Sequence, residues 1–174
     1  TVFEQQTKNI MDMVGQFTLT SLQEVDEKGS GNNNFGQLRL MSIEQSGSLL
    51  GSAYQPIRSQ PHAGDIYMNN TDNKLSDANM AKGENSYFTL IHEIGHALGL
   101  DHPFDGLSKE TGSPGKSFQN TVMSYDNYSG KQVSHKEGDV YKDYFPQTWM
   151  IDDIAALQYM YGVNEQTKRG DDTY

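Results

Sequence analysis

Hydrophobic residues recur at helical spacing near both ends of the chain. In the segment 3–14 these residues are Phe3, Ile10, Met11 and Val14, and in the segment 149–161 they are Met150, Ile151, Ile154, Ala155 and Leu157. Such spacings return to one face of an α-helix, so each segment is predicted to form an amphipathic helix. Because glycine commonly follows a helix end, we expect the first helix to stop before Gly15 and the second before Gly162.

Other segments alternate apolar and polar residues as half-buried strands do. They are 17–25, 38–42 and 63–69, and 52–54 is a candidate for a short edge strand. Strands and helices in this arrangement predict an α/β (or α+β) fold. We expect a twisted, mostly parallel sheet of about five strands, packed against the opening helix and a central helix.

The central helix is predicted over 86–100, where the sequence reads SYFTLIHEIGHALGL. Ser86 is a candidate for its N-cap and Gly99 for its C-terminal breaker. The following residues, 101–147, contain glycines and prolines and few apolar runs. They predict a long irregular region, and loops of that length usually carry function.

The composition indicates one globular domain, which we expect to span 1–174. The chain is 34% hydrophobic and 21% charged, and its net charge of -10 without a basic cluster disfavours a nucleic-acid partner. It has no cysteine, so disulfides and thiolate sites are excluded. No apolar run reaches the roughly 18 residues of a membrane span, and Thr1 opens no signal peptide. A cytosolic protein and an exported mature fragment both fit these observations.

The central helix carries a metal-binding pattern. His92, Glu93 and His96 read H-E-x-x-H, and a step of four residues brings both imidazoles onto one helix face. Glu93 lies roughly 100° around the helix from His92. It can therefore reach a water molecule at the metal without binding the metal itself, which suits a general base.

The pattern continues to a third histidine. Residues 92–102 read HEIGHALGLDH, which adds Gly99 and His102 at the spacing H-E-x-x-H-x-x-G-x-x-H. Gly99 can take the positive φ that a sharp turn requires, and three imidazoles leave one zinc position open for water. The alternative is that these are exposed helix histidines with an ordinary glycine cap. Three of only five histidines fall on one template, which favours the zinc site.

At these residues the chain resembles the metzincins, the metallopeptidases with this extended motif and a later Met-turn. The sequence TVMSY at 121–125 is similar to that turn. The resemblance implies that Met123 packs beneath the zinc and its histidines without binding the metal.

Two further matches resemble the serralysins, a secreted bacterial branch of the metzincins. Pro103 follows the third histidine, and Tyr125 follows Met123 by two positions. The segments 152–164 and 169–174 are similar to the last helix of that catalytic domain and to its junction with a calcium-binding repeat domain. The resemblance implies one catalytic Zn²⁺ held by His92, His96 and His102. It also implies that Tyr125 is a further ligand, which swings away to hydrogen-bond the oxyanion.

The resemblance also limits other metal sites. The glycine-rich calcium repeats of serralysins do not occur in this sequence, so we expect a catalytic fragment or a short member, and Ca²⁺ only through a repeat domain. Matrixins carry a second zinc, but the remaining histidines, His62 and His135, show no ligand cluster. Astacins fit less well because they require disulfides.

We therefore expect a secreted zinc endopeptidase that cleaves protein substrates with broad specificity. An extended peptide would pair with an edge strand, and Glu93 would accept a proton from water activated by zinc. A monomer and a proteinaceous inhibitor are further expectations. The rival is a binding or adhesion module that keeps the metal fold without turnover. Such a module would be expected to lose the base, whereas Glu93 is present.

Overall fold

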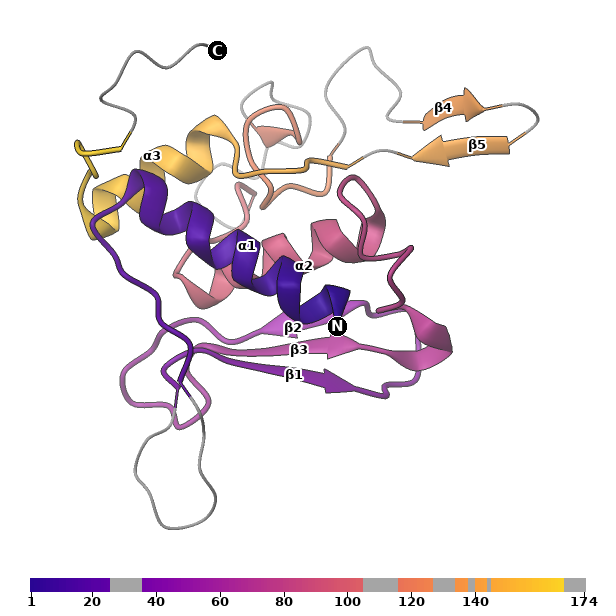
Figure 1. Cartoon of the computed structure of the whole chain (residues 1–174), viewed down its shortest axis with the longest axis horizontal. Helices are drawn as coiled ribbons and strands as arrows, with labels where there is room; N and C mark the ends of the chain where they lie inside the picture. Colours follow the sequence, from indigo (N-terminus) through magenta and orange to yellow (C-terminus); the bar gives the residue numbers. More distant parts are fainter. Residues whose placement is uncertain (26–35, 105–115, 127–133, 138–139, 144, 168–174) are drawn as a thin grey trace.

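The computed structural model describes residues 1–25, 36–104, 116–126, 134–137, 140–143 and 145–167. Its helices are α1 (Val2–Phe17), α2 (Asn85–Ala97), α3 (Ile151–Tyr161) and the short 3₁₀ turn η1 (Thr71–Asn73). Its strands are β1 (Arg39–Ile43), β2 (Gly51–Ala53), β3 (Asp65–Asn69), β4 (Ser134–Glu137) and β5 (Val140–Asp143). Figure 1 shows the first three strands as one layer, with α2 and α1 over it and α3 farther from the sheet.

The main sheet has three described strands in the order β1-β3-β2. β1 is parallel to β3, with Leu40 opposite Ile66, and β2 is antiparallel to β3, with Ala53 opposite Ile66. The strands expected at 38–42, 52–54 and 63–69 are therefore confirmed within one or two residues. The expected five-stranded, mostly parallel sheet is wrong for the described residues, which form a mixed three-stranded sheet in an α+β fold.

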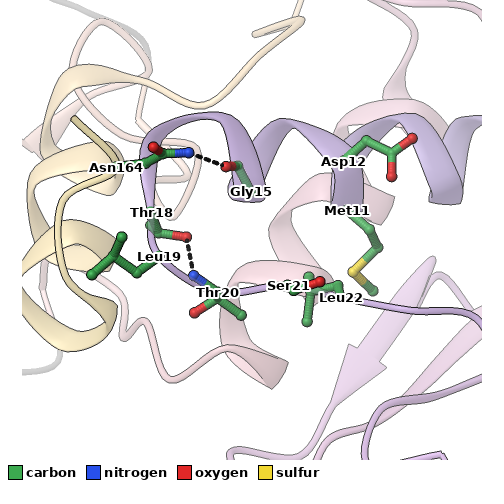
Figure 2. Close-up of a pocket in the computed structure, with 9 residues that line it drawn as sticks. All are labelled: Met11, Asp12, Gly15, Thr18, Leu19, Thr20, Ser21, Leu22 and Asn164. Carbon is green, nitrogen blue, oxygen red and sulfur yellow. Dashed lines mark hydrogen bonds between the residues drawn. The ribbon is translucent and has the colours of Figure 1, made fainter. Parts of the chain in front are cut away.

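The segment 17–25 accounts for one missing strand. Phe17 is the last residue of α1, and Thr18 makes a single antiparallel bridge with Val163 beyond α3. Figure 2 shows the chain from Thr18 to Leu22 passing the end of α1 beside a pocket of about 360 Å³. The Thr18 N–H donates to the Val14 carbonyl at 3.0 Å and its hydroxyl donates to the same carbonyl at 2.8 Å, so the helical bonding continues to this residue. No residue of the histidine motif lines this pocket.

Helix α2 forms the centre of the core. Eleven of its thirteen residues are buried, including Tyr87, Leu90, Ile91 and Ile94. It packs on β2 and β3, while α1 packs across α2 and also contacts α3. The helix begins at Asn85, and Glu84 occupies the N-cap without a side-chain cap bond. Ser86 is therefore inside the helix and is not the cap that the sequence suggested.

The bounds of α1 and α3 differ by a few residues from those predicted from the sequence. In α1 the Thr1 hydroxyl and the Glu4 side chain form a capping box, and the helix runs through Gly15 to Phe17. Burial of Ile10 and Val14 stabilises this longer helix. In α3 the first helical residue is Ile151, two positions later than predicted.

A β-ribbon lies within the region expected to be irregular. β4 and β5 pair antiparallel, with Glu137 opposite Val140, and they stand apart from the main sheet (Figure 1). The two residues between them are Gly138 and Asp139 in the sequence, a pair typical of hairpin turns. The sequence therefore carries a local signal for this hairpin inside the region predicted to be irregular. The predicted junction at 169–174 lies outside the described residues.

Candidate metal centre

The end of α2 brings the third histidine back toward the first two. Gly99 has φ +98°, its N–H donates to the His96 carbonyl at 2.9 Å, and the Leu100 N–H donates to the Gly95 carbonyl at 2.9 Å. These two bonds form a Schellman motif, which needs a positive φ at the glycine. The chain then reverses, and His102 follows two residues later. The sharp turn predicted at Gly99 is confirmed.

The three histidines point one nitrogen each toward a common place. Nε2 of His102 lies 3.1 Å from Nε2 of His96 and 3.3 Å from Nε2 of His92. Tetrahedral zinc with Zn–N distances of about 2.0–2.1 Å separates two ligand nitrogens by about 3.3–3.4 Å. These residues therefore fit a zinc ion. Within the described part of the chain, they are the one group of His, Cys, Asp or Glu side chains that could hold a metal ion.

Backbone carbonyls select the nitrogen that faces the metal. Nδ1 of His92 donates to the Val122 carbonyl at 2.8 Å, and Nδ1 of His96 donates to the Leu100 carbonyl at 2.8 Å. A ring whose Nδ1 carries the proton keeps a free lone pair on Nε2. Both rings are thus oriented, and held in the metal-binding tautomer, before a metal arrives.

Burial shifts the two titrating groups at the start of the motif in opposite directions. It lowers the pKa of His92 to about 4, with smaller contributions from the charges of His96 and His102 and an opposing one from the Val122 hydrogen bond. It raises the pKa of Glu93 to about 7. At neutral pH the His92 imidazole is therefore uncharged and able to bind a metal. The pKa of Glu93 is close to neutral pH, so its carboxyl group can both accept and donate a proton.

Glu93 lies directly beside the edge strand β2. A Cβ atom built on Gly51 would stand 2.9 Å from Cγ of Glu93 and 2.9 Å from Cγ2 of Thr89. The glycine therefore allows the strand backbone to approach the helix closely. This contact contributes to the burial of Glu93, of which 7% is exposed.

The segment 121–125 forms the turn that the sequence suggested, and it packs against α2. Met123 is 2% exposed, and its sulfur would stand 2.5 Å from a Cβ built on Gly95. The methionine thus packs against α2 between the positions of its two histidines. A side chain at Gly95 would displace it.

Helix α3 fixes this turn through Asp153, a residue near its N-terminus. The Asp153 carboxylate accepts from the Thr121 hydroxyl at 2.6 Å, the Val122 N–H at 2.9 Å and the Met150 N–H at 2.9 Å. Since the Val122 carbonyl accepts from His92, Asp153 supports the first histidine through the backbone of a single residue, Val122. Its position at the start of α3 was the one sequence signal that could have drawn attention to it.

Tyr125 lies at the metal centre with its side chain largely exposed. Its hydroxyl is 2.7 Å from Nε2 of His102, and its ring stacks on His92 at a centroid distance of 5.4 Å. The hydroxyl therefore reaches the same place as the histidine nitrogens. The structure also brings Phe104 to this site, stacked on His102, although no sequence pattern pointed to it.

The other histidine whose side chain the structure describes, His62, lies apart from this group. Its ring contacts Tyr54 at a centroid distance of 4.0 Å. The side chain of His135 is outside the described residues. As for membranes, the described helices include none of the length and apolar character that a bilayer crossing requires.

Comparison with known proteins agrees with this site. The sequence model of the matrixin family matches residues 32–108, which include all three histidines. Serralysin C of Dickeya chrysanthemi is 35% identical over 152 residues, which cover 83% of this chain and 27% of the relative. The metallopeptidase AprA of Pseudomonas marginalis is 35% identical over 159 residues, which cover 85% of this chain and 32% of the relative.

The metalloprotease AprA of Pseudomonas entomophila is 31% identical over 181 residues, covering 97% of this chain and 35% of the relative. The chain thus spans about a third or less of the length of these curated relatives. Their similarity extends over most of this chain and agrees with the three converging histidines, the buried Glu93 and the methionine turn. Residues 32–108 thus match the matrixin family, and the chain is a homologue of the serralysins over most of its length.

Proposed function

We propose that this domain is a zinc-dependent endopeptidase that hydrolyses peptide bonds of protein substrates with broad specificity. The convergence of three Nε2 atoms, with the buried Glu93 directly after His92 in α2, carries this proposal. His92, His96 and His102 would hold the zinc. When bound there, the ion supplies a Lewis acid that polarises the scissile carbonyl and lowers the pKa of water.

Glu93 has the role of general base and then general acid. Its raised pKa, caused by burial, favours proton uptake from the attacking water. The same carboxyl group then delivers the proton to the leaving amine. Because Glu93 is adjacent to His92 in α2, this proton transfer takes place next to the metal-binding nitrogens.

Tyr125 supplies a hydrogen-bond donor. Its hydroxyl lies near the histidine nitrogens, and a phenol can bind a metal through oxygen or donate a hydrogen bond when displaced. In the resting enzyme Tyr125 would be a further ligand, as the resemblance to serralysins implies, and during turnover it would donate to the oxyanion. The 62% exposure of the side chain leaves room for such a movement.

Substrate binds along β2 as an extended peptide. This strand is an edge of the described sheet and packs beside Glu93. Backbone hydrogen bonds to an edge strand depend little on the side chains of the peptide, which supports broad specificity. Export, a monomeric state and a proteinaceous inhibitor belong to the same proposal. They rest on the resemblance to serralysins.

Cleavage of casein by the zinc-loaded protein, with and without a chelator, tests the proposal. We expect chelator-sensitive cleavage. Glu93→Gln should retain zinc while losing about 10²–10⁴-fold in rate, because the amide keeps the shape but cannot accept a proton. Binding of casein without cleavage by the wild-type protein would instead favour a binding module. Substantial turnover by a zinc-loaded Glu93→Gln protein would remove Glu93 from its role.

A further inference from the structure

Phe104 is part of the metal centre, although neither the metal nor the base requires it. It follows His102 by two positions, and its ring stacks on the His102 imidazole at a centroid distance of 4.9 Å, with the planes 10° apart. The same ring contacts Tyr125 at 5.3 Å, with the planes tilted by 46°. One aromatic side chain therefore contacts both His102 and Tyr125.

The pose of Tyr125 depends on contacts of this kind. Its side chain is 62% exposed, and exposed side chains change rotamer readily. Its described ring contacts are His92, His102 and Phe104. The two histidines are fixed by their metal-binding role. Phe104 does not bind the metal. Its contact with Tyr125 can therefore set the pose of that side chain without a change in the metal ligands.

We propose that Phe104 is a positioning residue that holds the Tyr125 side chain beside the three histidines. It thereby sets the balance between the pose in which the hydroxyl reaches the metal and the pose in which it is turned away. Stacking on His102 anchors the Phe104 ring, so Tyr125 packs against a fixed surface. This inference rests on the proposed role of Tyr125 as a resting ligand that moves during turnover.

The balance has a kinetic consequence. A resting pose that occupies the metal position competes with substrate, and the apparent affinity for substrate falls with the fraction of molecules in that pose. An aromatic pair contributes enough to shift such a balance by roughly two- to tenfold. Phe104→Ala should therefore lower KM by roughly two- to tenfold. Because the ring acts before substrate binds, kcat should change by less than about twofold on the same argument.

Copper substitution gives a readout independent of activity. A phenolate bound to Cu²⁺ produces a charge-transfer absorption band in the visible range, and Tyr125→Phe should lack it. We expect the band in the copper-loaded wild-type protein and a weaker band in Phe104→Ala. Phe104→Trp keeps an aromatic face on His102 and should restore the band. Phe3→Ala removes the same atoms from a half-buried position in α1 and should leave the band unchanged.

The outcomes separate this inference from the proposed function. Absence of the band in the wild-type protein would overturn the metal contact of Tyr125, and the role of Phe104 with it. A wild-type band that stays unchanged in Phe104→Ala, together with an unchanged KM, would overturn the role of Phe104 alone. Metal analysis of each variant is required. Loss of copper from Phe104→Ala would show that Phe104 supports His102 instead, which also contradicts the inference.

Discussion

At the scale of single residues, the backbone partners of Nδ1 in His92 and His96 prepare the metal site. The motif predicted which residues meet, and the structure brings His92, His96 and His102 together. The motif could not predict that the Val122 and Leu100 carbonyls accept hydrogen bonds from Nδ1 of His92 and His96. These partners depend on the end of α2 and on a turn that is distant in sequence. Phe104 escaped prediction for the same reason, since its ring contacts arise only in the folded chain.

Glu93 should determine the acidic side of the activity profile. Its pKa is raised from 4.5 to about 7 by burial, and a nearby Zn²⁺ favours the carboxylate and lowers it again. We expect kcat/KM to fall as pH drops through a midpoint between these two values, because the protonated group cannot act as a base. The measurement is cleavage of a peptide across this pH range. A flat profile down to pH 4.5 would contradict the assignment.

The stability of the metal-free protein is a poorer test of Glu93. Between 4.5 and about 7 the folded carboxyl binds more protons than the unfolded one, so its contribution to the free energy of unfolding falls as pH rises. The pKa of His92 is lowered from 6.5 to about 4, and its contribution rises with pH in that interval. Between pH 4.5 and 6.5 the two contributions to the free energy of unfolding therefore change in opposite directions.

Tyr125→Phe should affect turnover more than metal retention. Three histidines already hold the zinc, so the variant should stay loaded. Loss of a donor to the oxyanion costs on the order of 3 kcal/mol, or about a hundredfold in kcat. If the hydroxyl acted only in the transition state, kcat and kcat/KM would fall together. Near-normal kcat would make the residue a spectator, and loss of zinc would show a larger ligand role than we assign.

At the scale of elements, α3 and the turn at 121–125 form one unit with α2. Asp153 receives three hydrogen bonds, two of them from the turn, and is 2% exposed. Tyr161, at the other end of α3, donates to the Leu98 carbonyl at 2.7 Å. One end of α3 thus supports the turn that orients His92, and the other end supports the end of α2 that leads to His102.

Asp153→Ala should destabilise the fold. The change leaves the Thr121 hydroxyl and the backbone N–H groups of Val122 and Met150 without their acceptor. Each buried unsatisfied donor costs about 1–3 kcal/mol, so we expect a loss of about 3 kcal/mol or more in the free energy of unfolding. Denaturant unfolding of the zinc-free protein measures this loss. Asp152→Ala, at the exposed neighbour, should change it by less than about 0.5 kcal/mol.

The elements were predictable from the sequence to different degrees. Periodic apolar residues located α1 and α3, whereas α2 was located by its candidate end signals, Ser86 and Gly99, and is buried almost all round. Alternation failed at 17–25, where Thr18 bonds back to Val14 and Leu19 bonds to the Gly162 carbonyl. Those partners lie in α1 and after α3. A local pattern cannot distinguish such a crossing from a strand, since both place alternate side chains on one side.

At the scale of the whole molecule, the metal centre joins parts that are distant in sequence. The helix α2 supplies two histidines, the reversal at Gly99 supplies the third, and the segment 121–125 supplies Met123 and Tyr125. The sheet contributes the edge strand β2 beside Glu93. A ligand that binds all three histidines should therefore stabilise the whole domain.

Zinc should bind once per chain and raise the stability of the domain. His92, His96 and His102 have ligand atoms within 4.8 Å of one another, and the described residues form no other such group. Binding to the folded form alone adds about 4.1 kcal/mol when free zinc is 1,000 times Kd. We therefore expect a chelator to lower Tm, His96→Ala to abolish that shift, and His62→Ala to preserve it. Metal analysis with thermal unfolding decides the matter. Two tightly held zinc ions per chain, or a Tm insensitive to chelation, would contradict the single site.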